Sequence, residues 1–190
     1  MPTSRKSALS QDDLVFAIRS LPPHPTHDDL LFIAMLLSGF YGLHRLGELS
    51  FPDDVELRDD QKTIKAASVV ISPSGYQYFL PGHKADRFFE GNTFPLSAEL
   101  WLTSAGTVPT RSFFMRRLRI LFNKSIAGQS MRAGGATSLA ENGVAPSIIQ
   151  ATGRWSSDAF QLYIRKNPVL IQALIFGRSL QSMPAYTHIS

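Results

Sequence analysis

The hydrophobic pattern of the first fifty residues predicts two helices and a short third one. A polar start at 10–13 precedes apolar residues at helical spacing, and the proline-rich run 22–25 ends this segment, whose apolar face comprises Leu14, Ala17, Ile18 and Leu21. Thr26 is a favourable N-cap for the next helix, with acidic residues in its first turn. Residues 30–41 are apolar on almost every side, which is typical of a buried central helix. A short helix is then predicted at 45–49.

The acidic segment at 53–60 predicts a surface loop. After it, the apolar residues no longer recur at helical spacing. Residues 63–72 are rich in Ile, Val and Ala, and a Pro-Ser-Gly turn separates them from an aromatic segment at 76–80. Together with a further segment at 93–96, these stretches predict a small three-stranded antiparallel sheet.

The remainder of the chain has a helical pattern, and the predicted helices are 111–122, 133–142, 146–152, 157–166 and 169–176. Gly143 suits the position after a helix end, and Pro146 suits a first helical turn. The predicted fold class is therefore mainly α (α+β), with one small sheet inserted early. The predicted organisation is a lead-in at 1–25, one domain at 26–180 and a tail at 181–190.

Composition excludes several classes of function and indicates one kind of partner. None of the 190 residues is a cysteine, which excludes a disulfide framework, a thiolate zinc site and a cysteine nucleophile. No segment predicts a membrane span or a signal peptide. Residues 1–61 hold five Lys/Arg against ten Asp/Glu (−5), and residues 62–190 hold fourteen against five (+9). Seven arginines within 111–165 predict a polyanionic partner such as nucleic acid, with a solvated basic face as the alternative.

Few residues form a catalytic pattern by themselves. His24 and His27 flank a proline run at a helix start, where a capping or turn role is favoured over metal binding. Neither common glycine-rich phosphate loop is present, and Gly134–Gly135 is better explained by close helix packing. Neither a metal site nor a cofactor is therefore predicted.

Three separated segments form a more informative set. The first contains Arg45 three residues before Glu48, which is a common helix pair. The second contains Arg132 at a predicted helix start, and the third places Tyr163 ten residues after Gly153. Each segment has an ordinary structural explanation by itself, but their joint order is not expected by chance.

In this order of residues the chain resembles the catalytic domain of the tyrosine recombinase (phage integrase) family, most closely the integrase-like enzymes of fungal Crypton mobile elements. The resemblance covers residues 26–180 and rests on Arg45-x-x-Glu48-Leu49 and on the stretch 130–163. It implies that Arg45 and Arg132 grip the scissile phosphate of double-stranded DNA, as guanidinium forks do. It also implies that Tyr163 is the nucleophile, which forms a 3′-phosphotyrosyl link and releases a 5′-hydroxyl.

The resemblance implies roles for further residues. Lys84 falls where the family keeps a hairpin lysine that protonates the leaving oxygen, with an ordinary turn lysine as the alternative. Trp155 is expected to pack beside the site, and Arg154 to contact a phosphate. The resemblance requires no metal and no nucleotide cofactor. It implies a nuclear location and self-association as a tetramer on DNA, in which 169–176 docks on a neighbour or closes its own core.

One position departs from the family pattern. Where His-x-x-Arg is expected, the chain has Gln129-x-x-Arg132. Glutamine donates a hydrogen bond to phosphate but carries no proton near neutral pH. If that histidine acts as a general base, its loss lowers the rate by about 10²–10⁴-fold. His44 and His83 are each adjacent to a matched residue and are expected to point elsewhere. Two alternatives stay open: a non-catalytic DNA-binding descendant, and a protein-interaction module that uses 169–176.

Overall fold

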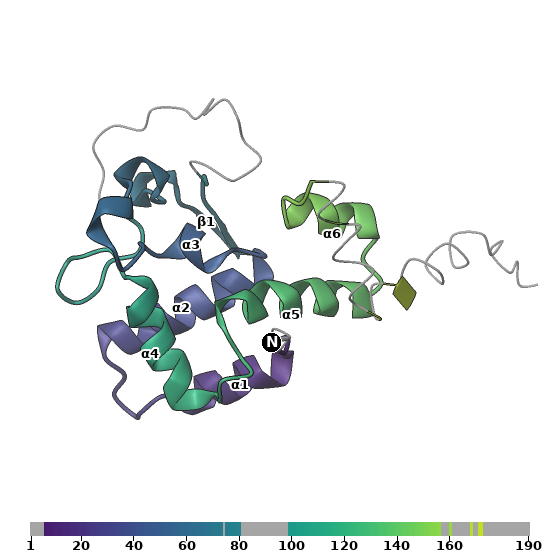
Figure 1. Cartoon of the computed structure of the whole chain (residues 1–190), viewed down its shortest axis with the longest axis horizontal. Coiled ribbons are helices and arrows are strands. Elements are labelled where there is room, and N and C mark those ends of the chain that lie inside the picture. Colours follow the sequence, from purple (N-terminus) through teal and green to yellow (C-terminus); the bar gives the residue numbers. More distant parts are fainter. Residues whose placement is uncertain are drawn as a thin grey trace, which may run out of the picture. The chain divides into compact units, whose positions relative to one another are not determined.

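The computed structural model describes residues 6–73, 75–80 and 99–156, together with Phe160, Pro168, Ile171 and Gln172. The chain forms two compact units, 1–135 and 136–190, and its described part is mainly helical (Figure 1). The helices are α1 (Gln11–Arg19), α2 (His27–Tyr41), α3 (Leu46–Leu49), α4 (Arg111–Leu121), α5 (Gly128–Glu141) and α6 (Pro146–Thr152). The short 3₁₀ helices are η1 (Val55–Leu57), η2 (Asp60–Lys62) and η3 (Ala66–Ser68), and the strands are β1 (Val70–Ser72) and β2 (Gly75–Gln77).

Both helix starts predicted near the N-terminus are confirmed. Ser10 and Asp13 form a capping box at α1, and Thr26 and Asp29 form one at α2. In each box the side chains satisfy backbone N–H groups that the helix leaves without partners. The predicted apolar face of α1 is only partly correct, because Ile18 is exposed.

Helix α2 is the centre of the first unit, as predicted. Eight of its fifteen residues are buried, including Met35, Leu36 and Phe40. Its two ends are exceptions, since Leu30 and Tyr41 are exposed. Around α2 the core draws on several segments between the N-terminal segment and α5; its members include Leu9, Leu14, Leu46, Ile64, Trp101, Phe114, Leu118 and Met131.

The predicted sheet is present in part. Strands β1 and β2 form an antiparallel hairpin in which Ile71 is opposite Tyr76. The predicted strand at 63–72 is wrong for most of its length, because 3₁₀ turns precede β1. Side chains favour these turns locally, since the Thr63 hydroxyl donates to the Asp60 carbonyl (2.7 Å) and the Ser68 hydroxyl to that of Lys65 (2.7 Å). The third predicted strand, 93–96, lies outside the described residues.

Helix α5 begins five residues earlier than predicted, at Gly128 instead of 133. The residue before it, Ala127, has no capping side chain, so the sequence lacks the usual start signal. Instead Ser130, on the first turn, accepts a hydrogen bond from the Ala127 backbone N–H at 2.9 Å. This is half of a capping box, made with serine at the third helical position. Arg132 consequently lies inside the helix rather than at its start.

The glycine pair in α5 is explained by close packing, as predicted. A Cβ at Gly134 would collide with the Leu9 carbonyl oxygen, and one at Gly135 with that of Phe40. Glycine lowers helix stability by roughly 1 kcal/mol relative to alanine. The pair therefore gives up helix propensity and lets α5 approach α2 and the N-terminal segment.

Replacing Gly135 by alanine is expected to destabilise the first unit by about 1–3 kcal/mol, because the obstructing Phe40 oxygen belongs to backbone and not to a movable side chain. Gly47→Ala in α3 is the matched control, since a Cβ there meets nothing within 4 Å. It is expected to be neutral or stabilising by about 0.5–1 kcal/mol. Thermal unfolding of both variants checks this, and equal effects would contradict the packing explanation.

The second unit contains the end of α5, helix α6 and the residues that follow. Gly143 has φ +75° and ends α5, and the Val144 N–H closes the turn on the Leu139 carbonyl (3.0 Å). Pro146 lies in the first turn of α6. The predicted roles of Gly143 at a helix end and of Pro146 at a helix start are both confirmed. Most of the helices predicted at 157–166 and 169–176 lies outside the described residues.

Candidate active site

The connection between α2 and α3 carries the first group of candidate residues on a strained turn. The His44 N–H bonds to the Gly39 carbonyl (3.0 Å) and the Leu43 N–H to that of Phe40 (3.3 Å), so α2 ends in a Schellman-type cap. Leu43 has φ +52° and is fully buried. This left-handed conformation costs roughly 1–2 kcal/mol for a non-glycine residue. Such strain clusters at functional sites, and here it directly precedes His44 and Arg45.

Glu48 organises Arg45 through two hydrogen bonds, which confirms the predicted helix pair. The Arg45 backbone N–H donates to Glu48 Oε2 (2.9 Å), and Arg45 Nη1 donates to Oε1 (3.1 Å). The Glu48 side chain is 9 % exposed and that of Arg45 is 38 % exposed. Among the described residues the Arg45 guanidinium makes no further hydrogen bond, and its partly exposed side chain retains N–H donors that can bind an anion.

His44 belongs to the same cluster, so the prediction that it points elsewhere is wrong. Its Nδ1 lies 3.3 Å from Glu48 Oε2, and its Nε2 lies 2.7 Å from the hydroxyl of Tyr78, just after β2. The spacing of His44 and Glu48 (i, i+4) is a signal that could have indicated half of this contact. Tyr78 comes from 34 residues away, and nothing in the local sequence links it to His44.

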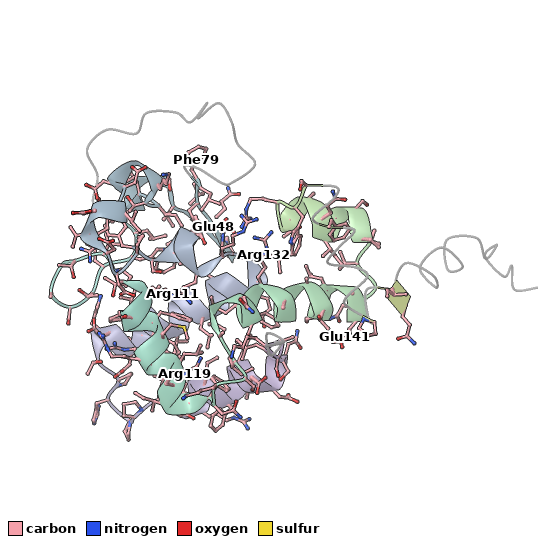
Figure 2. The ribbon with its side chains drawn as sticks, in the orientation of Figure 1. Glu48, Phe79, Arg111, Arg119, Arg132 and Glu141 are labelled. Atoms are coloured by element: carbon pink, nitrogen blue, oxygen red, sulfur yellow. The ribbon has the colours of Figure 1, made fainter. Side chains whose placement is uncertain are left out.

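Arg132 faces the same connection from α5. A Cβ at Gly128 would lie 2.7 Å from Leu46 Cδ2, and one at Gly135 would collide with the Phe40 carbonyl. Positions 128, 132 and 135 share one face of a helix, so Arg132 lies between these contacts and faces the segment that carries Arg45. Arg132 is 7 % exposed, and its Nε and Nη1 atoms are buried. Figure 2 labels Glu48 and Arg132, which project from α3 and α5 of the same unit.

Of the other predicted site residues, some lie within the described part of the chain and others lie outside it. Gln129 is exposed on the first turn of α5, three positions before Arg132. Lys84 and Tyr163 lie outside the described residues, as does His83. The structure therefore joins Arg45 to His44, Glu48 and Tyr78. Arg132 lies on the face of α5 that packs on the α2–α3 connection.

Arg154 and Trp155 belong to the second unit. Arg154 has φ +54°, the other positive φ of a non-glycine residue in the described part of the chain, and its Nη1 donates to the Thr152 carbonyl (2.9 Å). Trp155 packs on Phe160 with 5.8 Å between ring centroids, and a side chain at Gly153 would collide with the Trp155 ring. The glycine before Arg154 is thus needed for tryptophan packing.

Two of the arginines that gave the sequence its basic character have internal roles. Arg117 Nη2 bonds Asp28 (3.3 Å), and its guanidinium lies 4.0 Å from the Phe113 ring centroid. Arg119 donates to the carbonyls that follow α4, including that of Ile126 at 2.5 Å. Arg111 and Arg116, in contrast, are exposed on α4. Figure 2 labels Arg111 and Arg119 toward opposite ends of this helix. The basic surface is therefore smaller than the charge count suggests.

Three carboxylates outside the cluster have a lowered pKa. The Thr26 side chain lowers that of Asp29, the backbone N–H of Ser112 lowers that of Asp53, and the Lys65 ammonium lowers that of Glu99. Each of them holds two segments or a helix start in place. Their ionised forms therefore stabilise the fold, and protonation removes this contribution.

Replacing Asp29 by asparagine is expected to lower Tm at pH 7, with a difference from wild type that shrinks as the pH falls toward about 3. The folded pKa of Asp29 lies below the ordinary value of 3.8. Its contribution is therefore complete above that value and is lost as the pH falls through the folded pKa. Thermal unfolding across this range checks the sign. Asp12→Asn, at an exposed position, serves as the control, and a pH-independent difference for Asp29 would contradict the expectation.

A cavity of about 110 Å³ lies beside α3 in the first unit, and its lining includes Leu49, Leu57, Lys62, Trp101 and Val108. The Trp101 Nε1 is buried and has no hydrogen-bond partner among the described residues. Across the same residues, no cluster of three or more His, Asp or Glu side chains could hold a metal ion. Within the part that the structure describes, no helix has the length and apolar character needed to span a membrane.

No known protein family matches the chain, and no curated protein matches it either.

Proposed function

We propose that this chain is a DNA strand-transfer domain of the tyrosine recombinase type. The observation that carries the proposal is the approach of α5 to the α2–α3 connection, which directs Arg132 toward the segment of Arg45 although 87 positions separate them in sequence. A pair of guanidinium groups from separate segments is suited to a phosphodiester, because each fork offers parallel N–H donors to phosphate oxygens.

In the proposed reaction Arg45 and Arg132 bind the non-bridging oxygens of the scissile phosphate. They stabilise the negative charge that grows on these oxygens in the pentacoordinate transition state. The Tyr163 phenol oxygen attacks phosphorus as its proton passes to water, the bond to the 5′ oxygen breaks, and Lys84 delivers a proton to that oxygen. The 3′-phosphotyrosyl bond retains the energy for rejoining. Arg154 adds a phosphate contact, and Trp155 packs beside the tyrosine.

The remaining features of the proposal follow the family resemblance. They are a third strand at 93–96 that completes the sheet around the Lys84 turn, double-stranded DNA as the partner, self-association on DNA, and action in the nucleus. The net charge of +9 on residues 62–190 supports a polyanionic partner.

Gln129 favours a second candidate, a DNA-binding descendant of the same fold without strand-transfer activity. A glutamine at this position offers a hydrogen bond to phosphate but accepts no proton from the tyrosine. The two candidates share DNA binding and differ in whether Tyr163 becomes linked to DNA.

A suicide substrate separates these candidates. The purified chain is mixed with nicked DNA duplexes that cover the ends of the source element, and a denaturing gel reveals covalent protein–DNA adducts. Strand transfer predicts an adduct that is lost in Tyr163→Phe. An adduct from Gln129→His but not from wild type would favour the non-catalytic descendant.

Salt dependence tests the binding step itself. Phosphate-led binding weakens steeply as salt rises, with a slope that counts the phosphate contacts. DNA binding without an adduct in either chain would support the DNA-binding descendant. Absence of salt-dependent DNA binding would overturn both candidates and leave the protein-interaction module that uses 169–176.

A further inference from the structure

A continuous series of hydrogen bonds in the first unit links the side chains of Tyr78, His44 and Glu48. The Tyr78 hydroxyl lies 2.7 Å from His44 Nε2, and His44 Nδ1 lies 3.3 Å from Glu48 Oε2. The side chains of His44 and Glu48 are each 9 % exposed, whereas Tyr78 is only half-buried. These hydrogen bonds therefore connect a covered carboxylate to a tyrosine that is partly exposed.

The direction of each hydrogen bond follows from the groups involved. A carboxylate oxygen only accepts, so the bond to Glu48 requires a proton on His44 Nδ1. In the neutral imidazole Nε2 is then an acceptor, and the Tyr78 hydroxyl donates to it. A hydroxyl donating to a histidine that a carboxylate orients is the arrangement that activates nucleophiles in hydrolases.

The surroundings hold these groups in position. The Tyr78 ring stacks on the imidazole (5.6 Å, 25°) and contacts the Trp101 ring edge-on (6.2 Å, 90°). Next to Tyr78, the Phe79 N–H donates to Ser68 Oγ (3.2 Å), which fixes the backbone after β2. A Cβ at Gly42 would lie 2.5 Å from His44 Nε2, so the glycine leaves the imidazole the space that it occupies.

The Glu48 carboxylate also binds the guanidinium of Arg45, a cation suited to an anionic substrate. Arg45 Nη1 donates to Glu48 Oε1, and the Arg45 side chain is 38 % exposed. Glu48 therefore orients both the base, His44, and a guanidinium that binds phosphate oxygens.

We propose that Tyr78 is a second nucleophile of this chain, independent of Tyr163, and that it takes a phosphoryl group from small phosphate esters. The Tyr78 oxygen forms a bond to phosphorus while its proton passes to His44 Nε2. The bond from phosphorus to the leaving oxygen breaks with its electron pair, and the imidazolium returns the proton to that oxygen. Glu48 stabilises the imidazolium, and Arg45 binds the phosphoryl oxygens. Because Tyr78 is half-buried and its ring contacts the rings of His44 and Trp101, its hydroxyl admits a small ester more readily than a duplex.

The unmodified full chain contains its own control for exposure. Tyr41 is 60 % exposed and has no hydrogen bond to a histidine among the described residues. If exposure alone set reactivity, Tyr41 would react faster than Tyr78. Diisopropyl fluorophosphate, a phosphoryl electrophile, is added and modification of each tyrosine is followed by mass spectrometry of peptides. We expect Tyr78 to be modified at least about 10²-fold faster than Tyr41, as a general base provides. Equal or faster modification of Tyr41 would overturn the proposal.

Two variants separate base catalysis from a structural role. His44→Gln keeps a polar side chain but no base, and Gly42→Ala keeps all three residues while its Cβ displaces the imidazole. Both are expected to lower the Tyr78 rate to that of Tyr41, while the circular dichroism spectrum and the thermal unfolding of each variant report whether its fold is intact. An undiminished Tyr78 rate in a folded His44→Gln chain would refute the role of His44. The comparison within the wild-type chain remains decisive where a variant does not fold.

The class of phosphate ester is tested in a Tyr163→Phe chain, which lacks the nucleophile proposed for DNA strand transfer. The result for Tyr78 therefore stays valid even if the proposed DNA function fails. Bis(4-nitrophenyl) phosphate is expected to release 4-nitrophenolate in one equivalent per chain, and Tyr78→Phe to abolish that release. Absence of release would overturn the assignment to phosphate esters. A DNA adduct mapped to Tyr78 would overturn the restriction to small esters.

Discussion

Replacing Arg132 by lysine is expected to reduce adduct formation with a suicide substrate by about 10³-fold, the size of effect seen when one charge-stabilising donor is removed from a transition state. Lysine keeps the positive charge but loses the planar fork, so it contacts one phosphate oxygen where arginine contacts two. Arg132 is 7 % exposed and lies on the face of α5 that packs on the α2–α3 connection. The shorter reach of an ammonium at this covered position increases the loss.

DNA binding by this variant is expected to change little, because the number of phosphate charges neutralised stays the same. Binding titrations at several salt concentrations and adduct yields, measured on the same samples, separate the two effects. Arg116→Lys, at an exposed position of α4, is the matched control and should leave both unchanged. Adduct formation by Arg132→Lys at the wild-type rate would exclude Arg132 from the reaction.

Replacing Glu48 by alanine is expected to destabilise the first unit by about 3 kcal/mol. The carboxylate accepts from the backbone and guanidinium of Arg45 and lies beside His44 Nδ1. Its side chain is 9 % exposed, so its removal leaves covered donors without an acceptor, which costs more than the pair itself contributes. For a chain of this size the change lowers Tm by roughly 6–12 °C.

Glu48→Gln tests the charge separately from the shape. The amide oxygen still accepts one hydrogen bond, but its NH₂ group faces donors, so an intermediate loss of Tm is expected. Glu56→Ala in η1 is the control and should change stability by less than about 0.5 kcal/mol, because this side chain is exposed. A loss of Tm in Glu48→Ala no larger than in Glu56→Ala would contradict the organising role of Glu48.

The local features of the fold could be predicted from the sequence wherever a short motif carries its own physical reason. The helix starts at Ser10 and Thr26 and the helix end at Gly143 are local hydrogen-bond or backbone effects, and all three predictions are confirmed. The start of α5 could not be predicted in this way, because Ala127 gives no capping signal. Residues 63–72 have strand composition, but hydroxyl-to-carbonyl bonds favour the 3₁₀ helices at 60–62 and 66–68, and only 70–72 form a strand.

The candidate site likewise has features that follow from local sequence and features that depend on tertiary packing. The pairing of Arg45 with Glu48 depends only on their three-residue spacing at the start of α3, and the sequence determined it. The sequence also determined that Gly134–Gly135 serves close packing, since two glycines inside a helix need such a reason. Only the tertiary structure decided which face of α5 meets the α2–α3 connection, and therefore that Arg132 turns toward Arg45. It also decided that Tyr78 meets His44, because a contact across 34 residues depends on how the hairpin packs and not on any local preference.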